Sequence, residues 1–391
     1  MTDLNHKFPF LQNLQHVTRH ADETRGVHVE NCIGFVPVPV GVAGPLRVQG
    51  TGTPSDNFYA PLATTEAAMV ASCSRGSKAF TASGGIQFEV LGESMSRAPV
   101  FIFPSPLEAI KFAELVPTLR GQFEEATDAA SRYAKLQTVI PHIIGSTVHV
   151  RFEFHCADAV GQNMASMAAA RCCDSFKSSE LSKELRLQRV IEEGQMTSDK
   201  KPSWGNVMRT RGTRVMAWGL ITDKVSQSVL RCSTAELYKT LTIAKEGEIR
   251  GGQFGSNINA ANVVTSLFVA TGQDEANAVD GSWCQLTPEF DYESGDLRLT
   301  MFFPSLPVGT FGGGTHYPAQ NELLDLLKCN GHGLKGRLAG LIAAFSLALD
   351  VSTCAAVTHN SFAYSQTRLR KSLTGQEPDK DWGFHIPGRH A

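Results

Sequence analysis

The sequence predicts an α/β (α+β) fold, in which helical and strand segments follow one another along the whole chain. Segments with apolar residues at helical spacing are interleaved with short segments of alternating or β-branched residues. The 391 residues are enough for two or three domains, at roughly 100–200 residues each. Apolar residues make up 42% of the chain and charged residues 19%, which is the balance of an ordinary globular protein.

The first fifty residues predict a helix followed by extended backbone. Residues 1–30 are polar, have helical patterning and end in a charged ADETRG turn. Residues 33–48 place three prolines and three glycines among β-branched side chains, which excludes a helix interior. We therefore expect extended backbone with tight turns in the second segment.

Residues 63–80 predict a helix that is buried on all sides. Small residues and helix formers follow one another without interruption as far as Gly76. Thr64 or Thr65 can cap its start, which places Glu66 in the first turn, where a carboxylate is favourable. If the carboxyl group of Glu66 is desolvated, its pKa rises and it suits a proton donor at neutral pH. An exposed carboxylate that only stabilises the helix dipole is the alternative.

The remainder of the chain continues the mixed pattern. Further helices are expected at residues 105–137, 158–167, 235–244, 257–270 and 323–349, the last broken near residues 330–333. Strands are expected at residues 148–154, 213–222 and 297–303. Residues 183–193 fit either a helix or a charged strand, and residues 309–314 form a glycine-rich loop.

Composition excludes several classes of function. The net charge of −2 provides no general attraction to nucleic acid or to an anionic membrane. The nine cysteines are scattered without a CxxC pair, which predicts free thiols in a reducing, cytoplasmic setting and no metal site. Residues 1–14 lack the apolar core of a signal peptide, and no apolar run approaches the roughly 20 residues of a membrane helix. The longest candidate, residues 338–351, is expected to be a buried helix.

Two polar motifs stand in glycine- and alanine-rich surroundings. The DKKP motif at residues 199–202 forms a loop, in which a lysine beside an aspartate can hold positive charge at a developing oxyanion. Asp274 follows the apolar helix predicted at residues 257–270, so it opposes the helix dipole and needs a cationic partner. Lys200 is available as that partner. Each motif, taken alone, also fits a solvated surface turn.

Two glycine-bearing segments can bring backbone N–H groups against phosphates. They are DAVGQNM at residues 158–164 and GTFGGGT at residues 309–315. Either of them can equally be a tight turn.

These motifs follow one another in the order found in a known family. ENCIGFVPVPVGVAGPL (residues 30–46) closely resembles the ENVIGYMPVPVGVAGPL signature of HMG-CoA reductases. ATTEAAMVAS (residues 63–72) resembles the motif of their catalytic glutamate, and SMSRAPV (residues 94–100) resembles their substrate-arginine segment. DAVGQNM, DKKP, NINAANVVTSLFVATGQD and VGTFGGGT then follow in family order. The resemblance covers about residues 20–350, and its details look most like the class I, eukaryotic-type catalytic domain.

The resemblance implies a four-electron reduction of (S)-3-hydroxy-3-methylglutaryl-CoA to mevalonate and free coenzyme A, with NADPH as the reductant. Glu66 would protonate the aldehyde-level oxygen, Lys200 would stabilise the oxyanion, and Asp274 would hold and tune both. His359 would protonate the departing thiolate.

Residues for binding are also implied. Those for the acyl-CoA substrate are Ser72, Arg75, Arg97, Asp199, Lys201 and Asn262. Those for NADPH are Asp158, Ala159, Gly161, Gln162, Asn163, Met164, Gly312 and Gly313. Arg97 and Lys201 would bind the carboxylate of the acyl group, Asn262 would join the network beside Lys200, and Arg75 would meet coenzyme A.

The family fold implies three parts. A helical N-terminal part spans residues 1–35, and a large domain around a central helix spans residues 36–98 and 196–391. A small ferredoxin-like domain for the cofactor is inserted at residues 99–195. Members of the family assemble as dimers or tetramers with shared active sites, and the ENCIG segment would lie at that contact.

Three departures from the family pattern bear on the chemistry. Glu193 stands where the family has a serine that touches the substrate carboxylate, so either Glu193 turns away or the substrate differs. Residues 245–257 are shorter than the corresponding family stretch, which leaves Lys245 open as a ligand, and Asn259 replaces a histidine. Aligned on the final His-Asn pair, Ala356 replaces the thiolate-protonating histidine, whereas a small shift gives that role to His359.

Three functions therefore remain open. The first is reduction of HMG-CoA, favoured by Arg97 and Lys201. The second is reduction of another acyl-CoA or carrier-bound thioester, favoured by Glu193. The third is a non-catalytic binding or regulatory homologue, against which the intact set of Glu66, Lys200 and Asp274 argues.

Overall fold

The structure is a computed structural model that describes residues 14, 16–17 and 26–361. The helix expected within residues 1–30 lies largely outside these residues. In the described stretch 26–35 the chain forms turns and irregular backbone and no helix.

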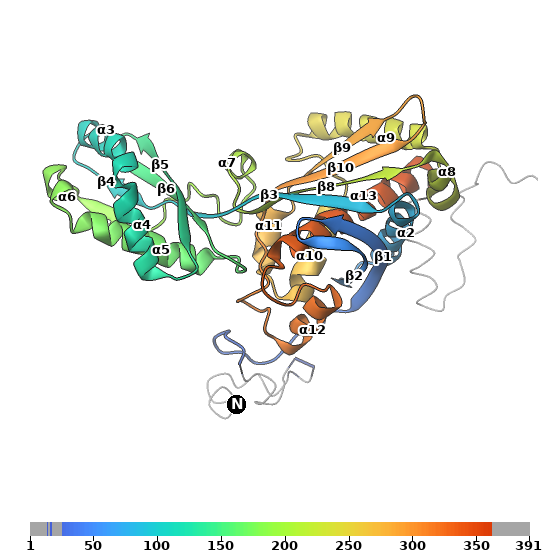
Figure 1. Cartoon of the computed structure of the whole chain (residues 1–391), viewed down its shortest axis with the longest axis horizontal. Helices are drawn as coiled ribbons and strands as arrows, with labels where there is room; N and C mark the ends of the chain where they lie inside the picture. Colours follow the sequence, from blue (N-terminus) through green and yellow to red (C-terminus); the bar gives the residue numbers. More distant parts are fainter. Residues whose placement is uncertain (1–13, 15, 18–25, 362–391) are drawn as a thin grey trace, which may run out of the picture.

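Two separate hydrophobic cores divide the described chain into a large and a small lobe, which lie side by side in Figure 1. The small core uses residues between Met95 and Leu185. The large core draws on the chain before and after that stretch, up to Phe88 and again from Val215. The small lobe is thus an insertion in the chain of the large lobe.

The sheet of the large lobe is antiparallel except at one pairing. β1 (Val40–Gly50) and β2 (Thr53–Ala63) form a hairpin, and β1 also runs parallel to the first part of β3 (Ile86–Arg97). Beyond β3 lie β8 (Gly212–Ile221), β10 (Leu297–Leu306) and β9 (Gln285–Phe290), in that order.

α13 (Lys335–Thr358) forms the centre of the large lobe and packs against α2 (Met69–Ala82), α10 (Ala260–Thr271) and strands β8 and β10. All its residues from Leu338 to Ala356 are buried. By length and composition alone it could cross a membrane, but 94% of the apolar window is buried inside the protein. The buried helix expected at residues 338–351 is confirmed, as is the break that separates it from α12 (Pro318–Leu326).

The close packing of α2 on α13 depends on a glycine. A Cβ atom on Gly76 would lie 1.8 Å from the carbonyl oxygen of Ala348, so no larger residue fits at this crossing. The remaining helices of the large lobe are α7 (Trp204–Met208), α8 (Asp223–Val225), η3 (Ser226–Leu230), α9 (Thr234–Gly251), η4 (Glu275–Asn277) and α11 (Ala278–Gly281).

The small lobe has the β-α-β-β-α-β order of a ferredoxin-like fold. Its strands are β4 (Val100–Ile102), β5 (Lys135–Ile144), β6 (Thr147–His155) and β7 (Arg189–Ile191). They pair antiparallel in the order β7-β4-β6-β5. Its helices are α3 (Pro106–Leu115), η2 (Val116–Leu119), α4 (Arg120–Ala130), α5 (Gln162–Lys177) and α6 (Glu180–Glu184).

One strand belongs to both lobes. From Ile86 to Ser94, β3 pairs with β8 of the large lobe, and from Met95 to Arg97 it pairs with β6 of the small lobe. The backbone therefore passes from one core to the other without a loop, and Arg97 stands at the end of the shared strand.

Several expected boundaries are wrong. The helix expected at residues 63–80 begins only at Met69, because β2 continues to Ala63 and an irregular stretch follows. The helical stretch expected to reach residue 137 ends at Ala130, where β5 follows after a short turn. Residues 183–193 are neither one helix nor one strand, since α6 ends there and β7 begins.

The cysteines are free, as expected, and most are enclosed. Eight of the nine are buried, and only Cys32 is partly exposed. Burial raises the pKa of each of the eight buried thiols above its ordinary value, to about 12 for Cys73 and about 11 for Cys156.

Candidate active site

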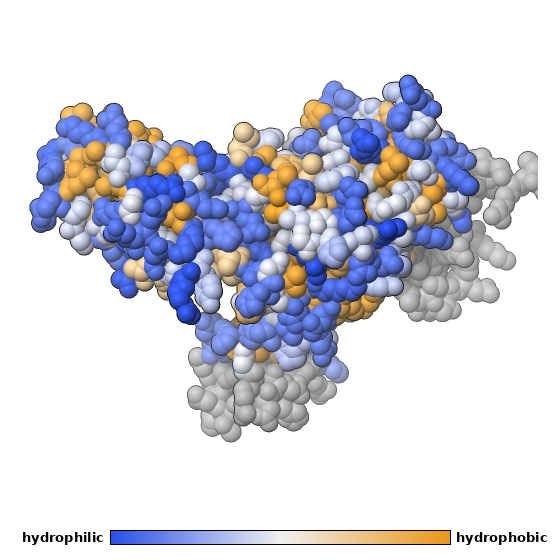
Figure 2. Space-filling model, viewed as in Figure 1, coloured by the Kyte–Doolittle hydropathy of each residue, from blue (hydrophilic) through white to orange (hydrophobic). Residues whose placement is uncertain are grey.

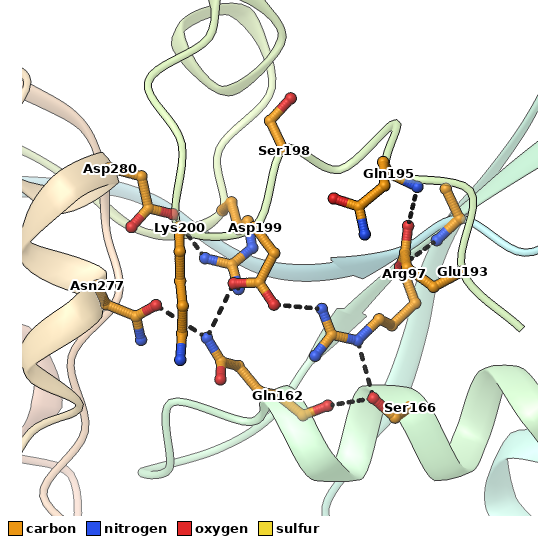
Figure 3. A network of polar contacts seen from close by, with 12 residues as sticks. Arg97, Gln162, Ser166, Glu193, Gln195, Ser198, Asp199, Lys200, Asn277 and Asp280 are labelled. Carbon is orange, nitrogen blue, oxygen red and sulfur yellow. Dashed lines mark hydrogen bonds and ion pairs between the residues drawn. The ribbon is translucent and has the colours of Figure 1, made fainter.

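The predicted substrate and lysine motifs meet where the two lobes join. Arg97 reaches this place from the end of β3, Gln162 and Ser166 from the first turns of α5, and Asn277 and Asp280 from η4 and α11 (Figure 3). The loop between β7 and α7 crosses the same region and carries the DKKP motif.

Asp199 is the centre of a charged network in this region. Arg97 donates to one of its carboxylate oxygens at 3.1 Å and to the hydroxyl of Ser166 at 2.8 Å. Arg211, which is wholly buried, donates to the other oxygen of Asp199 and, at 2.7 Å, to Asp280. The two carboxylates each bind one terminal nitrogen of this enclosed guanidinium and balance its buried charge, while its Nε has no hydrogen-bond partner among the described residues.

Burial raises the pKa of Asp280 to about 6, although the nearby Arg211 guanidinium acts in the opposite direction. Gln162 connects the network to the other lobe, because its amide donates to Asn277 at 3.0 Å and to Asp199 at 3.4 Å. The side chains in Figure 3 therefore link both lobes through polar contacts.

Lys200 and Asp274 form the ion pair expected from the sequence. The ammonium of Lys200 lies 2.8 Å from a carboxylate oxygen of Asp274, and both side chains are partly exposed. Asp274 follows Gly272, which ends α10 in the left-handed conformation, and it accepts a hydrogen bond from the backbone of Ala276 at 3.1 Å. Lys200 itself has φ 57°, a conformation that is sparsely populated for a lysine and that concentrates at functional sites.

Glu66 is exposed and lies before α2, not in its first turn, because the helix starts three residues later. Its backbone N–H donates to the hydroxyl of Thr64 at 3.0 Å. Its carboxylate accepts from the amide of Asn262, on the first turn of α10, at 2.8 Å. Within the described part of the chain, no hydrogen bond joins this pair to Lys200 or Asp274, so the expected contacts of Asn262 with Lys200 and of Asp274 with Glu66 are not formed.

A cavity of about 220 Å³ opens beside Arg97. The residues that line it are Arg97, Ser166, Glu192, Glu193, Gln195, Thr197 and Asp199. Lys201 lies at its edge, where its ammonium donates to the side chain of Gln195 at 3.3 Å and to the carbonyl of Asp199 at 3.2 Å.

Glu193 does not pair with Arg97 but with backbone amides. Its carboxylate accepts from the N–H of Ala98 at 3.2 Å and of Gln195 at 2.9 Å. The N–H of Gly194 donates back to the carbonyl of Ala98 at 2.8 Å. Glu193 thus links the loop between β7 and α7 to the end of β3. The two backbone N–H groups partly stabilise the negative charge of its carboxylate.

The two glycine-bearing segments predicted for phosphate contact lie against each other. The carbonyl of Asp158 accepts from Thr310 at 2.8 Å, and Ala159 forms a parallel bridge with Phe311. A Cβ on Gly309 would lie 2.5 Å from the backbone nitrogen of Val160, so this approach requires glycine.

The glycine-rich loop also meets the segment that carries Asp274. Gly314 donates to the carbonyl of Gly272 at 3.0 Å, and the buried amide of Gln273 exchanges two hydrogen bonds with the backbone of Gly309. The Lys200–Asp274 pair is therefore held next to the glycine-rich loop.

The other residues predicted for the cofactor lie around the same loop. Gly161 precedes α5 with φ 90°, and Gly312 and Gly313 have φ 84° and 60°. Asn163 is exposed on the first turn of α5, and the sulfur of Met164 accepts from Ser131 at 3.8 Å.

Ser72 and Arg75, predicted for coenzyme A, both contact α13. The hydroxyl of Ser72 lies 2.9 Å from that of Ser352, and the guanidinium of Arg75 donates to the same hydroxyl at 2.9 Å. Burial lowers the pKa of Arg75 somewhat, so its charge is partly enclosed on this face.

His359 is exposed at the C-terminal end of α13, whereas Ala356 is buried one turn earlier. The pKa of Glu236 on α9 is lowered chiefly by hydrogen bonds from Ser233, with a further contribution from His359. Among the described residues, no contact joins His359 to Glu66, Lys200 or Asp274.

Several residues of the site were missed in the sequence. The sequences around Arg211 and Asp280 resemble those of surface residues, and no local motif distinguishes them, although both side chains are buried. His332 and Gly333 contact the carboxylate of Asp158 at 3.3 and 2.9 Å. The GHGLKG spacing at residues 331–336 is the signal that could have found these two.

Comparisons with known proteins identify the family. A family model described as hydroxymethylglutaryl-coenzyme A reductase matches residues 7–371. The 3-hydroxy-3-methylglutaryl-coenzyme A reductase of Aeropyrum pernix is 37% identical over 358 residues, 89% of this chain and 82% of the relative. Reductase 2 of Dictyostelium discoideum is 35% identical over 375 residues, 93% of this chain and 69% of the relative.

Among solved structures, a class II 3-hydroxy-3-methylglutaryl-CoA reductase of Streptococcus pneumoniae bound to NADPH has a TM-score of 0.66 at 19% identity. The match covers 84% of this chain and 78% of that chain. This likeness confirms the expected fold. The family match over nearly the whole chain settles its membership, and the chain belongs to the hydroxymethylglutaryl-coenzyme A reductase family.

Proposed function

We propose that this protein reduces (S)-3-hydroxy-3-methylglutaryl-CoA to mevalonate and free coenzyme A, with two molecules of NADPH as reductant. The observation that carries the proposal is the Lys200–Asp274 pair, which is held beside the glycine-rich loop in a chain of this family. The relatives named 3-hydroxy-3-methylglutaryl-coenzyme A reductase, which match it over most of its length, support the same reaction.

In the proposed reaction, Lys200 and Asp274 stabilise developing negative charge, and Glu66 donates a proton. Bound NADPH supplies two hydride equivalents, which with two protons convert the thioester to an alcohol and a thiol. The ammonium of Lys200, fixed by Asp274, stabilises the negative charge that develops on the acyl oxygen. Glu66, held by Asn262, delivers a proton to that oxygen at the aldehyde stage.

The glycine segments suit the phosphates of the cofactor. The described contacts give the backbone N–H groups of Gly312 and Gly313 no acceptor, and the first turn of α5 presents further N–H groups beside them. Asp158, Ala159 and Gly161 shape this cradle, and Gln162, Asn163 and Met164 follow on the helix.

The cavity beside Arg97 is the proposed place of the acyl group. Arg97 and Lys201 supply positive charge for its carboxylate, and Asp199 orients Arg97. Ser72 and Arg75 are proposed to contact coenzyme A, on the face of α2 that meets α13. For the departing thiolate, His359 is the candidate proton donor, and water is the donor if Ala356 occupies that position.

Larger-scale proposals follow from the same family assignment. The proposal that the chain belongs to the class I, eukaryotic-type group rests on the resemblance of its sequence motifs alone. The small lobe, at residues 99–195, is the cofactor domain, and the residues on either side form the substrate domain. Dimers or tetramers share active sites through residues 30–46, and the protein works in the cytoplasm, in keeping with its free cysteines.

A second reaction of the same type, on another acyl-CoA or carrier-bound thioester, is favoured by one observation. Two glutamates, Glu192 and Glu193, line the cavity with Arg97. Their negative charges repel a substrate carboxylate and so disfavour its binding there. A non-catalytic homologue is disfavoured, because the Lys200–Asp274 pair is complete.

The test is NADPH oxidation with HMG-CoA against a panel of acyl-CoAs that lack the carboxylate. Turnover with HMG-CoA at the highest kcat/KM is the expected result. A higher kcat/KM for a neutral acyl-CoA would establish the second reaction instead. NADPH binding without turnover of any thioester would reject both.

A further inference from the structure

Asp350 is an ionisable residue in the middle of the most apolar helix of the protein. It lies on α13 between Leu349 and Val351, and its side chain is wholly buried. An isolated carboxylate in such a place is strongly unfavourable unless hydrogen-bond donors surround it. The hydrogen-bond partners of Asp350 therefore indicate its role in the protein.

Both carboxylate oxygens of Asp350 are occupied by the start of α10. One accepts from the backbone N–H of Ile258 and the other from that of Asn259, each at 2.9 Å. Asn259 is the residue that precedes α10, and its own side chain makes no capping hydrogen bond. Its amide instead donates to Thr353 of α13 at 2.9 Å. α13 thus anchors the two residues that lead into α10, while the side chain of Asn257 accepts from the first helical N–H, that of Ala260, at 3.3 Å.

The first turn of α10 carries Asn262, the residue that binds the carboxylate of Glu66. The backbone N–H of Asn262 donates to the carbonyl of Asn259 at 3.0 Å, and its side-chain amide donates to the carboxylate of Glu66 at 2.8 Å. Glu66 itself stands on irregular backbone, so its orientation depends on this contact. A short chain of hydrogen bonds therefore runs from Asp350 to Glu66.

We propose that Asp350 is a positioning residue, which fixes the first turn of α10 so that Asn262 holds the carboxylate of Glu66 in place for proton transfer. The catalytic part of this inference rests on the proposed function, in which Glu66 is the proton donor. The structural part, the anchoring of α10, does not.

The electrostatic surroundings make this anchor sensitive to pH. The pKa of Asp350 is raised to about 7, chiefly by burial and to a smaller extent by Glu248 of α9, against the hydrogen bonds from Ile258 and Asn259, which lower it. The other titratable neighbours are the buried thiols of Cys284 and Cys354, and the pKa of each is raised by burial and by Asp350. Protonation turns one of the two acceptor oxygens into a donor, which faces a backbone N–H and weakens the anchor of the segment before α10.

Asp350→Asn reproduces the protonated state at every pH, because an amide offers one acceptor and one donor group. We expect kcat to fall by about tenfold, with NADPH affinity unchanged, since two charge-assisted hydrogen bonds are weakened. Below pH 7 the wild-type kcat should approach that of the variant. Ser346→Ala is the matched control, because Ser346 is buried one turn earlier on α13 and its hydroxyl has no hydrogen-bond partner in the described structure.

A double-mutant cycle separates positioning from general loss of structure. On the Asn262→Ala background, Asp350→Asn should change kcat by less than about twofold, because the link to Glu66 is already cut. An undiminished tenfold effect on that background would overturn the proposal that Asp350 acts through Asn262.

Hydrogen exchange of the backbone amides of residues 258–262 tests the anchor without any assay of activity. Faster exchange in Asp350→Asn than in Ser346→Ala supports the anchor, and equal exchange overturns it. If the wild-type protein turns over no thioester, the proposed function fails, and exchange alone still decides whether Asp350 anchors α10.

Discussion

Arg211 organises the cavity beside Arg97, although no sequence pattern marks it. The RTRGTRV segment places an arginine at every second or third position, and only the fold determines which one is enclosed. Arg211 is wholly buried between Asp199 and Asp280, whereas Arg209 is exposed. The candidate residues Arg97, Asp199 and Lys200 could be predicted from their motifs, but the ion pair of Asp199 with Arg211 could not.

Arg211→Ala should lower the free energy of unfolding by about 3–5 kcal/mol, because it leaves two carboxylates without their buried partner. Arg209→Ala is the control, with an expected loss below about 1 kcal/mol, since its ion pair with Glu153 at 3.8 Å is half exposed. Urea denaturation measures both. Equal effects of the two substitutions would contradict the importance of the enclosed pair.

Lys200→Ala should reduce kcat of thioester reduction by about 10²–10³-fold, because the positive charge at the developing oxyanion is lost. NADPH affinity should change little, because the phosphates are proposed to bind to the glycine segments and not to Lys200. Steady-state kinetics and fluorescence titration of NADPH give the two values. Parallel loss of both would refute the role assigned to Lys200.

Asp350 should also affect stability as a function of pH. Because its pKa is raised in the folded protein, the folded state binds the proton more tightly, and its contribution to stability is greatest below pH 4. That contribution is lost as the pH rises through about 7, by on the order of 4 kcal/mol. The difference in unfolding free energy between wild type and Asp350→Asn should follow this course between pH 4 and 8. A difference that is constant over this range would exclude titration of Asp350.

At the scale of elements, periodicity predicted the helices well and their junctions poorly. The separation of α12 from α13 follows from a run of turn residues near residues 330–333, and the end of α10 follows from Gly272. The expected start of α2 is too early because residues 64–68, although rich in helix formers, form irregular backbone after β2, and Ala68 before the helix has φ 72°. β5 was missed because it follows directly on a helical segment.

The crossing of α2 and α13 provides a direct test of packing. Gly76→Ala should destabilise the protein by about 1–3 kcal/mol or more, because the new methyl group meets the carbonyl of Ala348. Gly247→Ala, on the exposed face of α9 with open space around it, should stabilise by roughly 0.5–1 kcal/mol. Thermal or urea denaturation distinguishes the two signs. Equal effects would mean that helix propensity alone governs both positions.

At the scale of the whole molecule, the site is built from segments up to 196 residues apart in its hydrogen-bonded pairs. Glu66 and Asn262, and Lys200 and Asp274, become neighbours only through the fold. Resemblance to a family predicted which residues matter, because the motifs are specific. It could not predict that Glu193 is satisfied by backbone amides, since that depends on the local path of one loop.

Self-association is predicted from an exposed apolar stretch near the start of the described chain. Phe35, Val36, Val38, Val40 and Val42 are all at least 39% exposed, whereas Figure 2 shows apolar groups elsewhere on the visible face mostly as small, separate patches among polar side chains. Val36→Lys together with Val38→Lys should shift the protein toward the monomer. Ile110→Lys, on α3 of the small lobe, is the control. Light scattering after size exclusion measures the mass, and an unchanged oligomer would exclude this surface.

The burial of eight cysteines has a practical consequence. Alkylating reagents attack the thiolate, and the raised pKa of each enclosed thiol suppresses that form at neutral pH. Cys32 alone is accessible in the folded protein, and it lies beside the apolar stretch that begins at Phe35. A maleimide fluorophore should therefore label the native protein at a single position without any cysteine being removed. Because Cys32 lies within residues 30–46, the proposed subunit contact, slower labelling at higher protein concentration would then report on self-association.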